Sequence, residues 1–469
     1  MKYILSKEKI VEKFLYLFIF LLPFENGLLI NTFKLPEFLK FRYLYLFLSF
    51  FIFIIFFKKI NIKNFDYKYM ILYIIFFSII LISSIINYTN IPHTYPFYNQ
   101  GYMYVQETRT LYLAIIKPLF FLFFSISIYL YCLNATKAIN IILKTLIIVG
   151  IISSLYGFYQ FIGYQLGLPG TAIFSRGDLL IGTLRRCEGI FYEPGPHAKY
   201  LSMCFFILVA DILNKNKYFY IFKSNKIKIF SLVIIFLGMI LTISPIGFIA
   251  PFFLLFLFLF NFKTTLLYLK NNTKKILRYL ITILILLTLF IFVLSQVKYS
   301  STESLLQYVY SKIIISIYSN DILEYYNPDS RTLRTYVGLS IFKDFPILGC
   351  GAGNATFLYY KYIPYINKII PIGDGIINQN VNFLAEFGLF GFISYSFIII
   401  YPFIKYFTHR KTKYNAYKFY IQLLLISLLY FVSVISFGNL FFFEIYFWII
   451  YICTLYLLDK ISYKIKEVF

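Results

Sequence analysis

The sequence predicts an all-α, polytopic membrane protein, and three observations carry this prediction. The chain has 469 residues, of which 60% are hydrophobic and only 14% are charged. A soluble protein of this size carries about 25% charged residues to cover its surface. The apolar residues also gather in long runs, many of them close to the 20 or so residues that a helix needs to cross the hydrocarbon core. We expect a single transmembrane helical bundle over residues 1–469.

About twelve apolar runs are candidates for transmembrane helices. The second is short, and the seventh and eighth are expected to form a hairpin. Between the ninth and tenth runs lies a large outer loop, residues 297–381, whose tyrosines and leucines recur at helical spacing. We expect this loop to fold as short amphipathic helices over the bundle. The runs are 13–33, 43–57, 69–87, 111–132, 138–164, 197–213, 228–243, 246–262, 277–296, 382–404, 419–437 and 440–458.

The basic residues predict the orientation of these helices. The net charge is +24, and lysines and arginines gather in the connectors after the second, sixth, eighth and tenth runs. Short connectors rich in Lys and Arg stay in the cytoplasm, so both termini are expected there. The connector that contains Lys34, Lys40 and Arg42 opposes this orientation. Because the charge follows the connectors, we interpret it as topogenic and expect no nucleic acid partner.

The five cysteines show no metal-ligand spacing. No cluster of metal ligands is visible elsewhere, so we expect neither a metal ion nor a cofactor. Cys187 and Cys350 fall in predicted outer loops, where they could form a disulfide or remain as free thiols.

The densest polar stretch of the chain is RRCEGIFYEPGPHAKYLSM, residues 185–203. Pro196 lies at the expected outer start of the sixth helix, where proline is favoured. The free amides and positive dipole end of such a helix bind anions. Arg185 and Arg186 lie upstream and can fold back beside them, and a guanidinium matches phosphate oxygens well. The alternative is an ordinary helix cap with interfacial arginines.

The large outer loop contains a second pair of arginines. Arg331 and Arg334 are three residues apart and share a face if this segment is helical. The following helix end at Pro346 leads into a GCGAG run, residues 349–353. Glycines at this spacing can wrap a phosphate, but the run has no Walker lysine and no βαβ context. Close backbone packing of the loop is the favoured interpretation.

Three further polar features interrupt apolar runs. TISPIG, residues 242–247, is interpreted as a tight hairpin turn rather than a binding element. Asn378 lies at the start of the tenth helix, where it would either contact substrate or cap the helix. Lys117 lies inside the fourth run. A charged side chain within the membrane costs free energy, and such residues are often functional. Snorkelling towards the interface is the alternative for Lys117.

These pieces occur in a recognisable order over roughly residues 180–395. Together they resemble the O-antigen ligase and O-antigen polymerase superfamily of bacterial inner membranes. The residues that carry the resemblance are Arg186-x-x-Gly189-x-Phe191-x-Glu193-Pro194, the break at Ser244 to Gly247, Ser330-Arg331, Phe345-Pro346 with Gly349-x-Gly351, and Asn378 followed by Leu384-Ala385-Glu386-x-Gly388.

The resemblance implies an undecaprenyl-pyrophosphate-linked oligosaccharide as substrate and an active site at the periplasmic face. It also implies that Arg186 and Arg331 hold the pyrophosphate. From the residues themselves, we expect Arg185, Arg334, Lys117 and Asn378 to contact the substrate as well. Ligases of this superfamily typically carry a histidine directly before the asparagine that matches Asn378. The residue at that position here is Ile377, which favours a polymerase.

We therefore expect a metal-independent, inverting glycosyltransferase that polymerises repeat units of O-antigen or a related surface polysaccharide. Glu193 is the first choice for the general base and His197 the second. Expected partners are the lipid-linked donor, membrane lipids and a chain-length regulator protein. A ligase that transfers the glycan to lipid A core remains an alternative, as does a flippase. A flippase would place charges at a midplane cavity, whereas the polar groups here concentrate in outer loops.

Overall fold

The computed structural model confirms the all-α fold class. It describes residues 67–88, 112–134, 137–171, 180–181, 184–191, 193–214, 220–254, 331–356, 358–362, 378–409, 418–434 and 444–466, together with 13, 16, 17, 54, 256 and 376. Within these segments the only strands are β1 (Leu180–Ile181) and β2 (Leu184–Arg185), which pair antiparallel.

The helices follow the predicted apolar runs closely. They are α4 (Tyr67–Tyr88), the π-helix η4 (Tyr112–Ile116), α6 (Lys117–Asn134), α7 (Ala138–Gln165), α8 (Pro194–Leu213), α9 (Asn225–Leu241), α10 (Pro245–Ile249), the 3-10 helix η5 (Ala250–Leu254), α15 (Arg331–Asp344), the 3-10 helix η6 (Asn354–Thr356), α16 (Tyr359–Tyr362), α17 (Gln379–His409), α18 (Lys418–Ser433) and α19 (Ile445–Lys466).

Five stretches of the described helices are long and apolar enough to cross a membrane. They coincide with the third, fourth, fifth, sixth and tenth predicted runs. The first, second and ninth runs lie almost wholly outside the described residues, so the total of about twelve stays a prediction. The five are Tyr67–Tyr88, Leu113–Leu133, Ala138–Gln165, Pro194–Leu213 and Gln379–Thr408.

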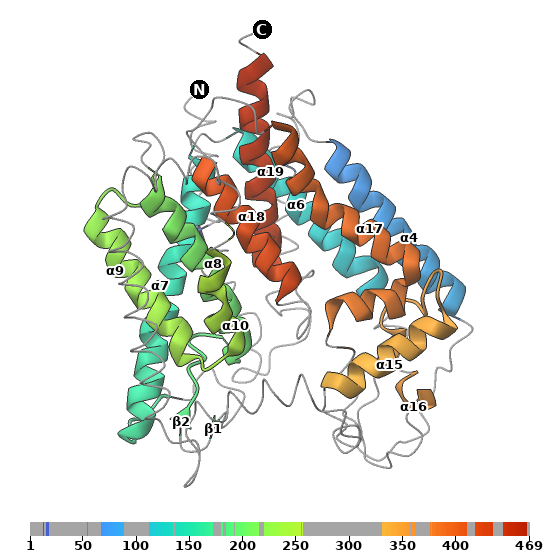
Figure 1. Ribbon diagram of the computed structural model, residues 1–469, viewed down its shortest axis with the longest axis horizontal. Coiled ribbons are helices and arrows are strands. Elements are labelled where there is room, and N and C mark those ends of the chain that lie inside the picture. Colours follow the sequence, from blue (N-terminus) through green and yellow to red (C-terminus); the bar gives the residue numbers. More distant parts are fainter. Residues whose placement is uncertain are drawn as a thin grey trace.

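The helices form two lateral groups with a central group between them (Figure 1). One lateral group contains α7, α8, α9 and α10, with α9 packed against both α7 and α8. The other contains α4, α15 and α17, with α17 packed against both of the others. The central helices α6, α18 and α19 connect the two groups, because α18 packs on α8 and α19 packs on α17.

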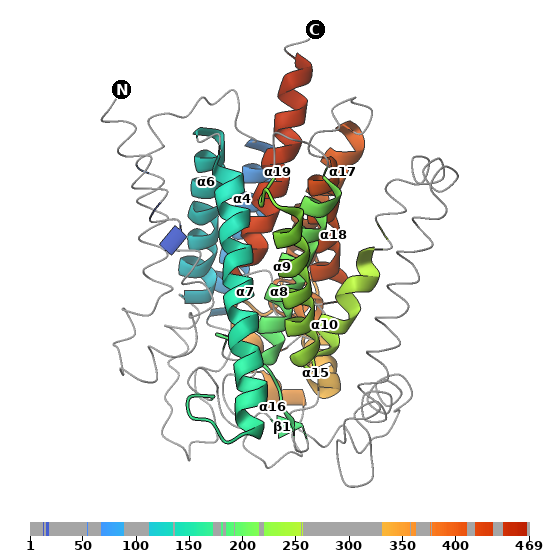
Figure 2. The same ribbon diagram turned by 90° about the vertical axis from the view of Figure 1, so that its left-hand side faces the viewer.

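Elements from the predicted outer loops gather at one end of this bundle. β1, β2, α15 and α16 lie at the end opposite the C-terminal end of α19, as the two views in Figures 1 and 2 both show. Of the large loop 297–381, the structure describes α15, η6, α16 and the residues around them. The two segments that contain the candidate arginines, at β2 and at α15, therefore lie at this end of the bundle.

Aromatic side chains form the centre of the core. Trp448 on α19 is fully buried and packs against Tyr73 on α4 at a ring-centroid distance of 5.3 Å. The hydroxyl of Tyr73 donates to the Pro118 carbonyl at 2.8 Å, at the start of α6. Lipid tails are as apolar as these side chains, so close packing and hydrogen bonds between helices must hold a membrane bundle together.

Helix α17 is broken at Gly388, whose backbone angles are φ 62° and ψ −162°. The segment 346–351 docks on the break and pairs with its backbone. Cys350 N donates to the Ala385 carbonyl at 2.9 Å, and Leu389 N donates to the Pro346 carbonyl at 2.8 Å. Backbone groups in a membrane need internal partners. The glycine run therefore serves close backbone packing, as its sequence context predicted.

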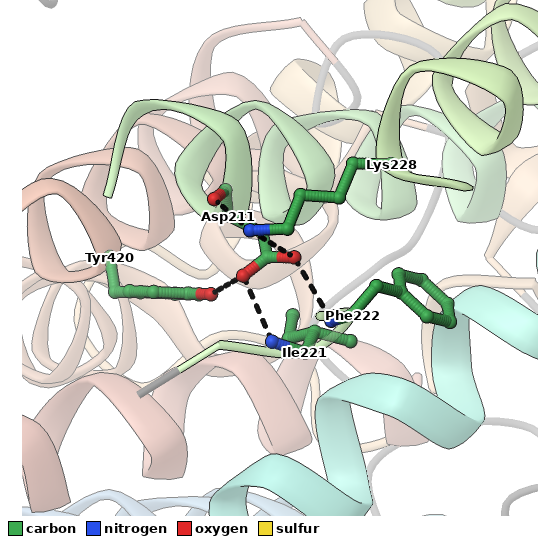
Figure 3. Close-up of polar contacts among 5 residues, drawn as sticks. All are labelled: Asp211, Ile221, Phe222, Lys228 and Tyr420. Carbon is green, nitrogen blue, oxygen red and sulfur yellow. Dashed lines mark hydrogen bonds and ion pairs between the residues drawn. The ribbon is translucent and has the colours of Figure 1, made fainter. Parts of the chain in front are cut away.

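A buried carboxylate anchors the end of α8 that lies away from β1 and β2. Asp211 is fully buried and accepts from the amides of Ile221 at 2.9 Å and Phe222 at 3.2 Å (Figure 3). It also accepts from the Tyr420 hydroxyl at 2.5 Å and lies 3.2 Å from the Lys228 ammonium. One side chain thus joins α8, α9 and α18 through four donors.

We expect Asp211→Ala to lower the thermal midpoint of the purified protein in detergent by several degrees. Removal of the carboxylate leaves the buried Lys228 ammonium and the Tyr420 hydroxyl without this acceptor, and breaking a buried ion pair costs about 3–5 kcal/mol. The matched control is Asp344→Ala, because the side chain of Asp344 is 39% exposed. Equal midpoints for the two variants would show that the Asp211 contacts contribute little.

Candidate functional site

The segment that leads into α8 is held between two neighbouring helices. Cys187 N donates to the Leu241 carbonyl at the end of α9, at 3.0 Å. The side-chain oxygen of Gln160 on α7 accepts from the amides of Glu188 and Gly189, at 3.1 and 2.8 Å. Because both helices fix its backbone, the segment presents its side chains in defined directions.

Helix α8 begins earlier than the sequence predicted. Its first residue is Pro194, and Glu193 is the N-cap residue with extended backbone angles. The Glu193 side chain makes no cap hydrogen bond and is half-buried. Proline at the first position needs no N–H partner, and the helix dipole places positive charge at this end. A carboxylate on Glu193 therefore lies at an electropositive helix terminus.

Arg186 connects two of the motifs singled out in the sequence. Its Nε donates to the Thr242 carbonyl at 3.1 Å, directly after the last residue of α9. Thr242 and Ile243 form the turn into α10, and Ile243 has a positive φ of 47°. The TISPIG motif is thus the tight turn that was predicted. A cation is favoured at a helix C-terminus, where the dipole is negative, so this contact fixes Arg186 beside α9.

Arg185 on β2 is a buried cation with few partners. It is 2% exposed, and its Nη1 lies 3.5 Å from the Thr171 hydroxyl. The guanidinium carbon lies 5.4 Å from the centroid of the Tyr164 ring. Nε and Nη2 have no hydrogen-bond partner among the described residues. A guanidinium has five N–H donors, and a buried charge without compensation is costly.

His197 is packed tightly between α7 and the segment before α8. It is fully buried, with Nε2 2.9 Å from the Ser153 hydroxyl and Nδ1 3.4 Å from the Cys187 carbonyl. Its ring stacks on Phe191 at a centroid distance of 5.4 Å. Both ring nitrogens are therefore engaged by protein groups, whereas Glu193 is only half-buried.

Cys187 and Cys350 are both free thiols, and both are buried. Burial, together with the nearby Glu188 carboxylate, raises the pKa of Cys187. Burial and the Glu386 carboxylate likewise raise the pKa of Cys350. Both side chains therefore remain protonated at neutral pH. Of the two possibilities, a disulfide or free thiols, the structure contains free thiols.

The second arginine segment is the helix α15. Arg331 is its first residue, and Arg334, one turn later, is 5% exposed. α15 packs on α17 through a small apolar cluster that includes Val337 and Val381. The two arginine segments therefore lie at the same end of the bundle but in different helix groups (Figure 1).

Asn378 and Lys117 lie at helix junctions. The Asn378 side-chain oxygen accepts from the amides of Asn380 and Val381, at 3.1 and 3.3 Å, and caps α17. Lys117 is half-buried where the π-helix η4 continues as α6. The cap is one of the two roles expected for Asn378.

The ion pair between Lys199 and Glu444 was not predicted from the sequence. Lys199 on α8 is 2% exposed, and its Nζ lies 2.6 Å from Oε1 of Glu444, the residue before α19. A lysine inside the sixth apolar run was a signal for such a pair. Among the described residues, no group of three or more His, Cys, Asp or Glu is arranged to hold a metal ion.

These features define a polytopic α-helical membrane protein with its two arginine segments at one end of the bundle. A family model described as O-antigen ligase matches residues 230–396, which include most of α9, together with α10, α15 and the break in α17. This match supports the resemblance of the chain to the O-antigen ligase and polymerase superfamily over residues 230–396. A comparison with curated proteins gives no match.

The family narrows the class of function. It indicates a glycosyltransferase-like enzyme of O-antigen assembly that acts on a lipid-linked oligosaccharide. Together with the membrane-spanning helices, it indicates a protein of the bacterial inner membrane. The matched region begins after Arg186 and Glu193, so the match covers α15 and its arginines but not the N-terminus of α8.

Proposed function

We propose that the chain is a polymerase that joins undecaprenyl-pyrophosphate-linked repeat units at the periplasmic face. The observation that carries this proposal is the Arg185–Arg186 pair in the segment that leads into α8. Arg185 is buried with two guanidinium nitrogens unbonded, and Arg186 is fixed next to it by Thr242. Phosphate oxygens are the acceptors that best match a guanidinium fork.

The proposed reaction is a displacement at the anomeric carbon of the donor. An acceptor hydroxyl forms the new C–O bond while the bond to pyrophosphate breaks, and the electron pair leaves with the pyrophosphate. The hydroxyl proton passes to a carboxylate. Arg185 and Arg186 from one helix group, and Arg331 and Arg334 from the other, neutralise the negative charge that develops on the leaving group.

Glu193 is the proposed general base. It is half-buried at the start of α8, seven residues after Arg186 along the chain. The contacts of His197 with Ser153 and Cys187 support a role in holding the segment before α8, so we keep His197 as the second choice. Lys117 and Asn378 are proposed as outer contacts of the lipid-linked substrate.

The residue before Asn378 supports a polymerase over a ligase, because Ile377 cannot exchange a proton as a histidine would. The proposed orientation has both termini in the cytoplasm. The loop 297–381 would then lie over the periplasmic end of the bundle. A chain-length regulator is a proposed partner, since a polymerase needs a signal to stop.

Deletion of the gene with plasmid complementation tests the proposal. We expect the deletion strain to make single-repeat products only and the complemented strain to restore long chains, as seen on polysaccharide gels. Full-length polymer that stays unattached to its acceptor would indicate a ligase instead. Lipid-linked units that accumulate on the cytoplasmic side would indicate a flippase.

A further inference from the structure

We infer that Lys199 and Glu444 form a subsite that binds a sugar hydroxyl of the glycan, an inference that rests on the proposed function. Lys199 lies in the second turn of α8, and its ammonium is 2.6 Å from Oε1 of Glu444. The pair is asymmetric, because the side chain of Lys199 is 2% exposed and that of Glu444 is 21% exposed. A ligand must therefore approach from the side of Glu444, whose partly exposed side chain has to turn to present its buried Oε2.

The hydrogen bonds of this pair are incomplete. A lysine ammonium has three N–H donors, and Glu444 is the only hydrogen-bond partner that the described residues provide for Lys199. Oε2 of Glu444 is buried and has no hydrogen-bond partner among the described residues. Ion pairs of low exposure are stable only when further hydrogen bonds satisfy their remaining donors and lone pairs. The pair therefore offers both a donor and an acceptor to a ligand.

This combination selects the chemical class of the ligand. A phosphate would be repelled by the Glu444 carboxylate, and a cation would be repelled by the Lys199 ammonium. A neutral hydroxyl donates one hydrogen bond and accepts others, so it can donate to Oε2 of Glu444 and accept from Nζ of Lys199. Sugars carry such hydroxyls on adjacent carbons. The arginine pair and the Lys199–Glu444 pair thus recognise different parts of one lipid-linked glycan.

The subsite has a fixed position relative to the proposed base. Lys199 is six residues after Glu193 in the sequence, which corresponds to about 9 Å along a helix axis. The start of α19 is held against α8 by a ring contact between Tyr200 and Tyr446, with centroids 5.9 Å apart. A glycan with its reacting hydroxyl at Glu193 can therefore place a neighbouring sugar at Glu444.

The single tryptophan of the chain provides a local probe. Trp448 lies one turn after Glu444, and its amide donates to the Glu444 carbonyl at 3.4 Å. The experiment titrates the purified protein in detergent with the lipid-free repeat-unit oligosaccharide from the producing strain. We expect a saturable change in Trp448 fluorescence. In the double variant Lys199→Met/Glu444→Met, we expect the affinity to fall by about tenfold or more.

The double variant removes both charges together, because apolar residues often replace a buried ion pair without loss of stability. Its thermal midpoint is measured alongside, so that a loss of binding in a folded protein supports the subsite. Glu193→Gln is expected to keep the fluorescence response while it loses transfer. A wild-type protein without a saturable response, or a folded double variant that binds normally, would overturn the subsite. A wild-type protein that binds the glycan but forms no polymer would overturn the polymerase proposal alone.

Discussion

Arg186→Ala is expected to abolish polymerisation while the protein still inserts into the membrane. The proposed role of the Arg186 guanidinium is to stabilise the leaving pyrophosphate, and loss of one such donor lowers a rate by about 100- to 1,000-fold. The measurement is the chain length of the polysaccharide in the deletion strain, with the variant present at wild-type level in membrane fractions.

Two further variants separate catalysis from structure. Arg186→Lys keeps the charge but loses the planar fork and its Nε, so we expect only partial activity. Lys343→Ala removes an exposed cation from the last turn of α15 and should leave the chain length unchanged. Because Arg186 also contacts Thr242, the thermal midpoint of each variant is compared. Normal chains from Arg186→Ala would remove Arg186 from the site.

Gly388→Ala is expected to prevent the break in α17 and to reduce the yield of folded protein strongly. A Cβ at Gly388 would lie 2.3 Å from the Ile347 carbonyl oxygen, and the φ of 62° disfavours any side chain. A residue with a Cβ in this glycine-specific region of φ and ψ costs about 1–3 kcal/mol, and the overlap adds about 1–3 kcal/mol. Size-exclusion chromatography of the detergent-solubilised protein measures the folded fraction.

Gly167→Ala is the matched control for this variant. Gly167 has a similar φ of 67°, but nothing lies within 4 Å of the position that its Cβ would take. The control therefore has a similar positive φ without the overlap and should lose much less folded protein. If both variants lost the same fraction of folded protein, then Gly388 would not be required for the docking of segment 346–351 on α17.

Most helices of the fold could be predicted because each depends on a local property. An apolar run of sufficient length specifies a membrane helix without reference to the rest of the chain. The fifth run was predicted at 138–164, and α7 spans Ala138–Gln165. The start of α8 was misplaced from Pro194 to residue 197 because the polar residues there lowered the apparent hydrophobicity. The break in α17 could not be predicted, because it depends on the docking of segment 346–351, a tertiary contact.

The polar groups were found in the sequence, but their partners were not. Arg186 contacts a carbonyl 56 residues away, and Lys199 pairs with a carboxylate 245 residues away. Asp211 joins three helices that the sequence treats separately. Residue types and apolar run lengths specify the membrane class, the helices and the polar stretches, since these are local properties. Tertiary packing alone specifies which charges meet, because ion pairs and hydrogen bonds form between segments that only the assembled bundle brings together.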